Sequence, residues 1–108
     1  MRDGLYKISF KTGLGTGSGV ITLRSGRLTG GDGASYYVGS YGLDGDCFVA
    51  EVLVDRHTFT AGLRPVFGVE HVRIRLEGVG VGDEAVMRGS SPDAPEVNFE
   101  AVIQRLAD

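Results

Sequence analysis

The sequence predicts a small all-β protein that folds as an antiparallel β-barrel of about eight strands. Apolar and polar residues alternate with a period of two in nearly every segment, Gly, Asp, Ser or Pro separates the segments, and no stretch has helical periodicity. Such strands close into a barrel or stack as two sheets, because an open sheet would leave one apolar face in water. We favour the barrel, since one strand carries glycines on a single parity, where absent side chains permit sharp bending or close backbone approach: Gly13, Gly15, Gly17 and Gly19.

The length and composition indicate one domain, residues 1–108, with one core. The chain has 108 residues, and a typical domain has roughly 150. Leu, Ile, Val and Phe make up about 29% of the chain, above the ~20% below which disorder becomes typical. The 18 glycines separate and bend strands without reaching the proportion found in low-complexity sequences.

In the first half, the alternation predicts a hairpin of strands at residues 5–12 and 16–24, then the turn Ser25-Gly26, which returns the chain through residues 27 and 28. Two further strands are predicted at residues 35–41 and 47–55. The turn between them is Leu43-Asp44-Gly45-Asp46, because Asp-Gly tolerates the positive φ of a type I′ turn. The predicted inward residues are Tyr6, Ile8, Phe10, Phe48, Ala50, Val52 and Val54.

In the second half, the alternation fails between residues 56 and 65, and we expect a long loop across one end of the sheet there. A strand follows at residues 69–77, then a turn at residues 78–83 and a short strand at residues 84–89. The last strand covers residues 97–105. The inward residues of this half are Val72, Ile74, Leu76, Val97, Phe99, Ala101 and Ile103.

The charge and the single cysteine exclude several classes of protein. The formal net charge is -3 with both signs mixed along the chain, whereas a protein that binds nucleic acid directly normally has a basic face. Cys47 cannot form an internal disulfide, so folding needs no oxidising compartment. The opening residues carry no apolar targeting segment, and no run is long enough to span a membrane. We therefore expect a cytoplasmic protein.

No motif predicts catalysis, a metal site or a cofactor. The glycine run at residues 13–19 matches no register of the G-x-G-x-x-G phosphate loop and precedes a strand. His57 and His71 are the only histidines and have no zinc-type ligand spacing. Cys47 has no neighbouring base in the sequence to activate its thiol. We expect a protein that is not an enzyme.

A sharper feature is Gly30-Gly31-Asp32-Gly33, which is followed closely by Tyr36 and Tyr37. One interpretation is a tight corner in which the carboxylate accepts hydrogen bonds from nearby backbone N–H groups. The other is a recognition surface, because paired tyrosines beside an exposed carboxylate are typical of interfaces. Both interpretations stay open on the sequence.

The pattern as a whole resembles the GrlR-like family, negative regulators of type III secretion in Gram-negative bacteria. Arg2-Asp3-Gly4-Leu5-Tyr6 resembles that family's opening Lys-Asp-Gly-Ile-Tyr. The family's second block is resembled by Gly26, followed by Gly30-Gly31-Asp32 and then by Tyr36 or Tyr37 before Gly39. The resemblance covers about the first 55 residues. It implies a lipocalin-like barrel, a homodimer, and repression by binding a transcriptional activator through an acidic turn.

The acidic turn is weaker here than the family pattern implies. Only Asp44 and Asp46 are acidic, while Leu43 and Gly45 are uncharged, so a basic partner is steered less strongly. The leading hypothesis is a non-enzymatic protein that binds and sequesters a regulatory protein, with these partner-binding residues: Asp44, Asp46, Gly30, Gly31, Asp32, Tyr36 and Tyr37.

Two other hypotheses remain. The barrel is alternatively a carrier of a small apolar ligand or lipid, with a cavity lined by Tyr6, Ile8, Phe10, Phe48, Val52 and Phe99. An enzyme of unknown class would need a polar cleft containing His57 and nearby carboxylates, and no acid–base pair in the sequence predicts one.

Overall fold

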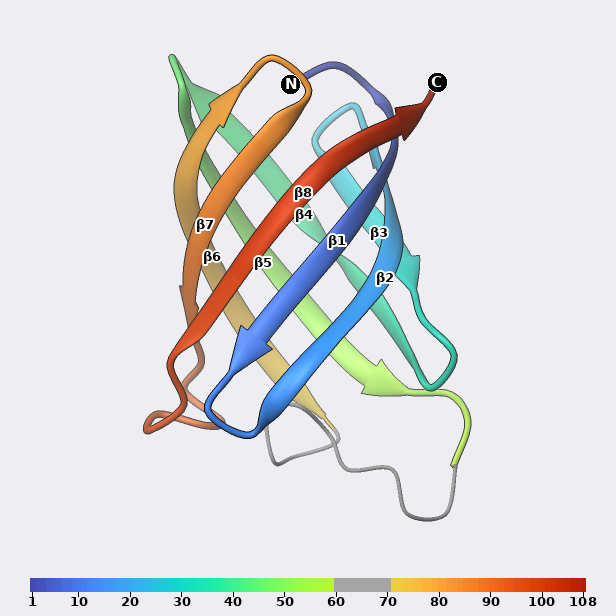
Figure 1. Ribbon diagram of the computed structural model, residues 1–108, viewed down its shortest axis with the longest axis vertical. Coiled ribbons are helices and arrows are strands. Elements are labelled where there is room, and N and C mark those ends of the chain that lie inside the picture. Colours follow the sequence, from blue (N-terminus) through green and yellow to red (C-terminus); the bar gives the residue numbers. More distant parts are fainter. Residues whose placement is uncertain (60–70) are drawn as a thin grey trace.

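The computed structural model describes residues 1–59 and 71–108, and its strands form one closed antiparallel barrel (Figure 1). The strands are β1 (Gly4–Thr12), β2 (Gly15–Arg24), β3 (Arg27–Gly31), β4 (Ser35–Asp44), β5 (Cys47–Arg56), β6 (Val72–Val81), β7 (Glu84–Ser90) and β8 (Phe99–Ala107). No helix in these ranges is long and apolar enough to cross a membrane.

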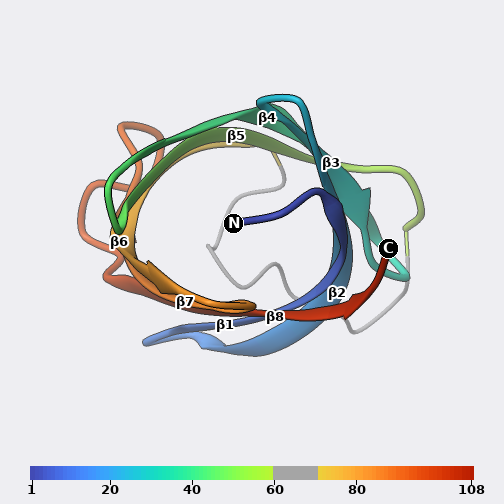
Figure 2. The same cartoon turned by 90° about the horizontal axis from the view of Figure 1, so that it is seen from above.

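Each strand pairs with its neighbours in the chain, and β1 also pairs with β8, which closes the ring seen in Figure 2. Each strand therefore has a hydrogen-bonded neighbour on both sides, although Gly15–Gly19 of β2 pair with β1 alone. The predicted fold class is therefore confirmed, and the architecture is consistent with a small lipocalin-like barrel. Most of the long loop predicted at residues 56–65 lies outside the described residues.

One predicted element is wrong. Residues 78–81, taken as the beginning of a turn, continue β6 as far as Val81, and the turn consists of Gly82 and Asp83. The cause is an inverted pattern: Gly78 and Gly80 face the interior, while Val79 and Val81 are exposed. Strand pairing to β5 and β7 overrides the usual preference of apolar side chains for the interior.

The core fills the barrel with alternate residues from its strands. The residues less than a tenth exposed include Tyr6, Ile21, Leu23, Leu28, Phe48, Val72, Leu76, Met87 and Ile103. Burying one such side chain stabilises the fold by roughly 1.5–3 kcal/mol. The rings of Phe10 and Phe99 lie 6.0 Å apart, and those of Tyr41 and Phe48 stack at 5.6 Å. The predicted inward parity of the first and fifth strands is confirmed by this packing.

The glycine run on β2 has a more specific role than bending alone. A Cβ atom on Gly17 would lie 2.6 Å from the Phe10 ring, and one on Gly19 would lie 2.9 Å from the Tyr37 hydroxyl oxygen. The ring of Phe10 from β1 and the phenol of Tyr37 from β4 therefore occupy space that side chains on β2 would fill. A Cβ on Gly13 or Gly15 would meet nothing within 4 Å, so the close-approach argument fails for those two.

Two hairpin turns differ in their backbone geometry. Ser25 and Gly26 both have positive φ, at 51° and 82°, as a type I′ turn requires. In the β4–β5 turn only Gly45 has positive φ, at 61°, and Asp44 pairs with Cys47. The central residues are thus Gly45 and Asp46, the pattern of a type II′ turn. The type I′ prediction is wrong because glycine occupies the first central position, not the second.

The N-terminal residues close one end of the barrel, a feature that sequence reasoning missed. Figure 2 shows the N-terminus over the centre of this opening. The Met1 side chain packs against the core, and its Cγ and Sδ would lie 3.3 Å from a Cβ on Gly80. The Arg2 guanidinium donates two hydrogen bonds to the Asp83 carboxylate, at 3.1 and 2.9 Å. The Arg2 carbonyl oxygen accepts one from the Tyr6 hydroxyl at 2.6 Å.

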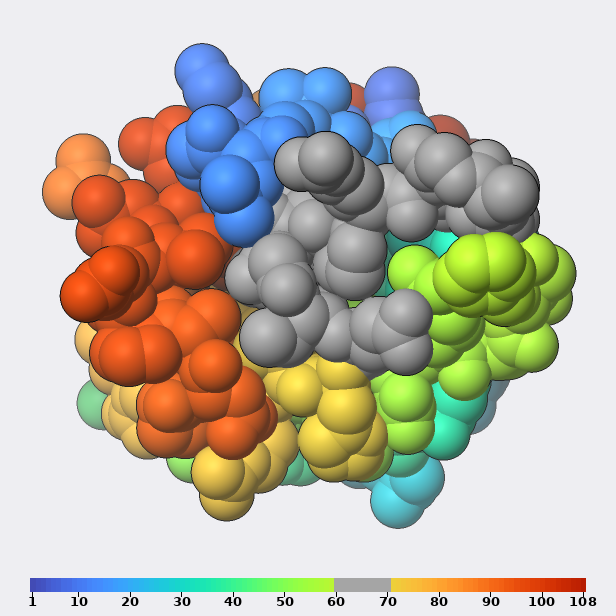
Figure 3. Space-filling model, turned by 90° about the horizontal axis from the view of Figure 1, so that it is seen from below, coloured from blue at the N-terminus to red at the C-terminus, as the bar shows by residue number. Residues whose placement is uncertain are grey.

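The opposite end carries the connection between β7 and β8 and the end of β5, which both reach the surface in Figure 3. Ser91 and Ala94 are buried in this connection, and the Ala94 N–H donates to the Ser91 carbonyl oxygen at 3.3 Å. Asp93 joins it to β6, because its carboxylate accepts hydrogen bonds from the Arg73 backbone N–H at 2.8 Å and from the Arg73 guanidinium. An arginine–aspartate pair therefore fixes a segment at each end, Arg2 with Asp83 at the first and Arg73 with Asp93 at the second.

Candidate partner-binding site

The β4–β5 turn presents two carboxylates to solvent at the end of the barrel that the N-terminus closes. Asp44 and Asp46 are exposed, and among the described residues neither makes an ion pair or a side-chain hydrogen bond. Leu43, beside them, is 39% exposed. Because their charge is not neutralised within the described chain, these carboxylates contribute a negative field outside this turn.

A backbone hydrogen bond attaches this turn to the next hairpin. The Gly80 N–H donates to the Asp46 carbonyl oxygen at 2.8 Å, which holds the β4–β5 turn beside the end of β6. Figure 1 shows the β4–β5 and β6–β7 turns at the same end of the barrel. The β6–β7 hairpin adds Glu84, which is exposed and likewise has no ion pair within the described ranges.

Asp83, in the same turn, is not a free charge. Its hydrogen bonds from the Arg2 guanidinium lower the pKa of this carboxyl, so it stays ionised but is paired. The unpaired carboxylates of the β4–β5 and β6–β7 hairpins are therefore those of Asp44, Asp46 and Glu84, which we call the acidic rim. Its members belong to two hairpins, and only the tertiary structure joins them.

The Asp32 corner has the structural role that one interpretation of the sequence predicted. The Asp32 Oδ1 atom accepts hydrogen bonds from the backbone N–H groups of Ala34, at 2.8 Å, and Ser35, at 2.7 Å. Its Oδ2 atom accepts one from the Tyr37 hydroxyl. The corner also holds His57, whose Nε2–H donates to the Asp32 carbonyl oxygen at 2.9 Å. These three donors occupy acceptor positions of the Asp32 carboxylate, so less of its hydrogen-bonding capacity is left for a partner.

The paired tyrosines separate to opposite sides of the barrel wall. Tyr37 is 5% exposed and lies inside, where burial raises the pKa of its phenol well above the usual value, with a further contribution from Asp32. Tyr36 is 39% exposed, and its hydroxyl lies 3.5 Å from the Asp55 carboxylate. The prediction that Tyr37 contacts a partner is wrong, because adjacent residues of a strand face opposite sides.

Gly30 and Gly31 are also structural. A Cβ on Gly30 would lie 2.1 Å from the Val20 carbonyl oxygen, and one on Gly31 would lie 2.6 Å from the Ser35 carbonyl oxygen. These glycines let neighbouring backbones approach, which leaves no side chain for recognition.

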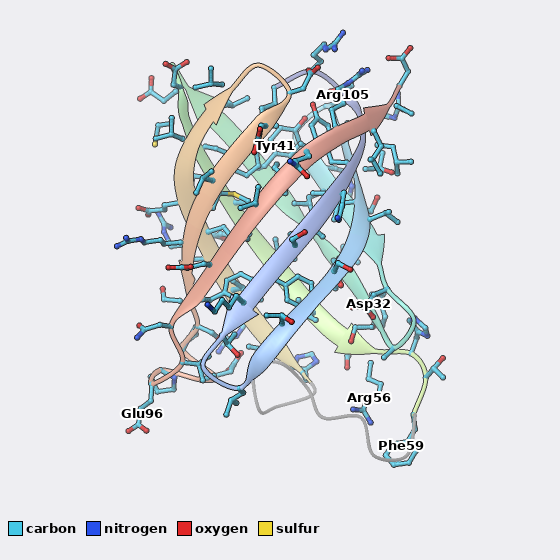
Figure 4. The ribbon with its side chains drawn as sticks, in the orientation of Figure 1. Asp32, Tyr41, Arg56, Phe59, Glu96 and Arg105 are labelled. Atoms are coloured by element: carbon cyan, nitrogen blue, oxygen red, sulfur yellow. The ribbon has the colours of Figure 1, made fainter. Side chains whose placement is uncertain are left out.

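The predicted partner-binding residues do not come together. Figure 4 shows Asp32 near the end of the barrel opposite the β4–β5 turn. The ten residues of β4 separate the corner from the turn, a distance of roughly 30 Å at about 3.3 Å per residue. Of the predicted set, Asp44 and Asp46 form the exposed charged part, and Tyr36 lies on a different stretch of the wall.

Both histidines make hydrogen bonds within the described chain, and the His57 ring Nδ1 lies 2.6 Å from the Thr58 hydroxyl oxygen in addition to the bond from its Nε2–H to Asp32. The His71 ring Nδ1 lies 3.0 Å from the Asp55 carboxylate, and this contact lowers the pKa of the Asp55 carboxyl. Where the structure describes the chain, no group of three or more His, Cys, Asp or Glu side chains is placed to hold a metal ion.

The residues predicted to line a ligand cavity all lie on the inner face. Tyr6, Ile8, Phe48, Val52 and Phe99 are buried, and Phe10 is half-buried against the core. They pack on one another and on neighbouring rings: Phe10 and Tyr37 meet edge to face at 6.4 Å. A separate hollow of about 310 Å³ is lined by Arg75, Glu77, Arg88, Gly89 and Ser90 of β6 and β7.

The sequence matches no model of a known protein family, and no curated protein is similar enough to match it. A functional conclusion therefore rests on the surface chemistry described above.

Proposed function

We propose that this barrel is a non-enzymatic regulatory protein that binds and sequesters a basic partner protein through its acidic turn. The observation that carries the proposal is the exposure of Asp44 and Asp46 without an ionic partner in the described chain. Carboxylates left unpaired at the surface attract a positively charged protein and fix its orientation.

A transcriptional activator fits this chemistry, because proteins that hold DNA phosphates present lysines and arginines. An acidic protein surface that covers those side chains competes with DNA. Activation then stops without any catalytic step. The resemblance of residues 2–6 and of the glycine blocks to the GrlR-like family supports negative regulation of type III secretion-type genes in the cytoplasm. It also supports a homodimer, which sedimentation of the full chain tests.

The test is capture of the partner in the native host. Native mass spectrometry of the gently purified full chain reports its oligomeric state and any stoichiometric protein bound to it. The variant Asp44→Lys/Asp46→Lys is expected to lose that partner while its far-ultraviolet circular dichroism is unchanged. Glu96→Lys/Glu100→Lys makes the same charge change at exposed residues near the other end and is expected to keep the partner. Full capture by the turn variant would refute the proposal.

A second candidate function is that of a carrier for a small apolar ligand. It is favoured by the apolar inner wall, which offers the chemistry such ligands need. Because the rings already contact one another, a ligand would have to displace Phe10 or its neighbours. Titration with a fluorescent fatty-acid analogue checks this function, and no binding at high micromolar concentration would exclude it.

A further inference from the structure

A row of register partners crosses the outside of the barrel beside the acidic turn. Asp44 pairs with Cys47, Cys47 with Val79, Val79 with Val86, and Val86 with Val102. Side chains of directly paired residues lie on the same face of a sheet, with Cβ atoms about 4.5–5.5 Å apart. The row therefore runs without interruption from a carboxylate through a thiol to three valines on β6, β7 and β8.

These valines are exposed to an unusual degree. Val79 is 58% exposed and Val86 is 60% exposed, while Val81, two residues beyond Val79 on β6, is 68% exposed. Val102 is half-buried at the end of the row. We call these four residues the valine ridge. Single exposed apolar residues are common, but a contiguous group with polar residues around it marks an interaction site.

The acidic rim borders the valine ridge. Asp44 belongs to the row itself, Glu84 is the register partner of Val81, and Asp46 is bonded through its carbonyl oxygen to the Gly80 N–H between the two β6 valines. An apolar centre with charged residues at its edge is the usual organisation of a protein interface.

We propose that the valine ridge and the acidic rim form one surface, and that it binds a basic amphipathic segment of the partner protein. The apolar side chains of that segment cover Val79, Val81 and Val86. Its lysines or arginines meet Asp44, Asp46 and Glu84. This inference rests on the proposed function and deepens it, because it names the second half of the partner site and the chemistry of the segment that occupies it.

Charge complementarity selects this occupant over two others. A second copy of the chain that paired through this surface would add the same acidic rim, so its rim would bring further carboxylates and no positive charge to balance Asp44, Asp46 and Glu84. An anionic lipid surface would be repelled for the same reason. A basic segment with an apolar stripe satisfies both parts of the surface at once.

The experiment is a nuclear magnetic resonance titration of the full chain, which observes backbone amides and valine methyl groups. The probe is a synthetic Leu/Lys amphipathic helical peptide of about four turns, and hexalysine serves as the charge-only control. We expect the amphipathic peptide to shift the methyl resonances of Val79, Val81 and Val86 together with the amides of the β4–β5 turn. Hexalysine is expected to shift the turn alone.

Two double variants separate the apolar contribution from the charge. Val79→Thr/Val86→Thr keeps shape and strand preference but adds hydroxyls, and we expect it to bind the amphipathic peptide about tenfold more weakly. Val20→Thr/Val38→Thr makes the same change at exposed valines of β2 and β4, which are 45% and 38% exposed. We expect this control to bind like the parent.

Each outcome decides the inference. Shifts at the valine ridge together with weaker binding of only the Val79→Thr/Val86→Thr variant support it. The inference is overturned if the amphipathic peptide shifts only the acidic turn, or if neither peptide shifts the valine resonances. It is also overturned if the two double variants bind the amphipathic peptide with equal affinity. If Asp44→Lys/Asp46→Lys loses the host partner while Val79→Thr/Val86→Thr still binds it like the parent, the proposed function is supported and the inference is refuted.

Discussion

Substitution by alanine is expected to have opposite effects on stability at two glycines of β4. A Cβ on Gly39 would lie 2.0 Å from the Glu51 carbonyl oxygen and 2.9 Å from the Val52 Cα. Both contacts are to backbone atoms of β5, so no side chain can rotate away. A Cβ on Gly42, three residues further along the strand, would meet nothing within 4 Å. Gly42→Ala is therefore a matched control for Gly39→Ala.

The magnitudes follow from these contacts. Overpacking a well-packed interior typically costs about 1–3 kcal/mol, and we expect about 3 kcal/mol for Gly39→Ala because the strand backbones must separate. Gly42→Ala is expected to stabilise the fold by about 0.5 kcal/mol, since alanine restricts the unfolded chain and has room in the folded one. For a domain of this size, 3 kcal/mol corresponds to a fall in Tm of roughly 12–24 °C.

Urea unfolding, followed by far-ultraviolet circular dichroism, measures both variants against the parent chain. Equal m-values would show that the same surface is exposed on unfolding and that the free energies can be compared. If Gly39→Ala and Gly42→Ala unfold with free energies within about 0.5 kcal/mol of each other, the close approach of β4 and β5 at Gly39 does not limit stability and the reasoning fails.

Two further predictions concern polar contacts. Tyr37→Phe removes a buried hydroxyl that donates to the Asp32 carboxylate, and it is expected to lower the free energy of unfolding by about 1.5–3 kcal/mol. Tyr36→Phe is expected to change the free energy of unfolding little. Urea unfolding of both variants checks this, and equal losses of stability would contradict it. The hydrogen bonds from Arg73 lower the pKa of the Asp93 carboxyl in the folded chain, so their stabilisation is present above pH ~4 and disappears as the pH falls through the lowered pKa. Asp93→Asn is expected to flatten the acid limb of a Tm-against-pH profile, and an unchanged limb would show that the pair contributes nothing.

The Asp32 corner shows how local sequence signals translate into structure. Glycines before an aspartate predicted a carboxylate bonded to backbone N–H groups, and the bonds from Ala34 and Ser35 confirm it. The signal succeeds because acceptor and donors lie within three residues of one another in the chain. The hydrogen bond from Tyr37 to Asp32 also depends on which side of β4 each tyrosine faces. The adjacent residues Tyr36 and Tyr37 did not indicate which of the two faces the interior.

The candidate site was predictable only in part. Asp44 and Asp46 flank a turn glycine, which places them at the surface whatever the rest of the chain does. Glu84 and the valine ridge gave no such signal. At the end of β6, Gly78 and Gly80 face the interior while Val79 and Val81 face water, the reverse of the pattern from which a strand's inner face is predicted.

The alternation of apolar and polar residues by itself determined that this chain is all-β and that its strands turn back on one another. It also determined which residues of β1 and β5 line the interior. Each of these properties depends on neighbours within a few residues. The tertiary structure decided what depends on distant segments. The pairing of β1 with β8 closes the barrel, Met1 and Arg2 cover one end, and the Gly80 N–H holds the acidic turn beside the exposed valines. Such contacts join residues far apart in the chain, and only the closed ring of strand pairings fixes which of them meet.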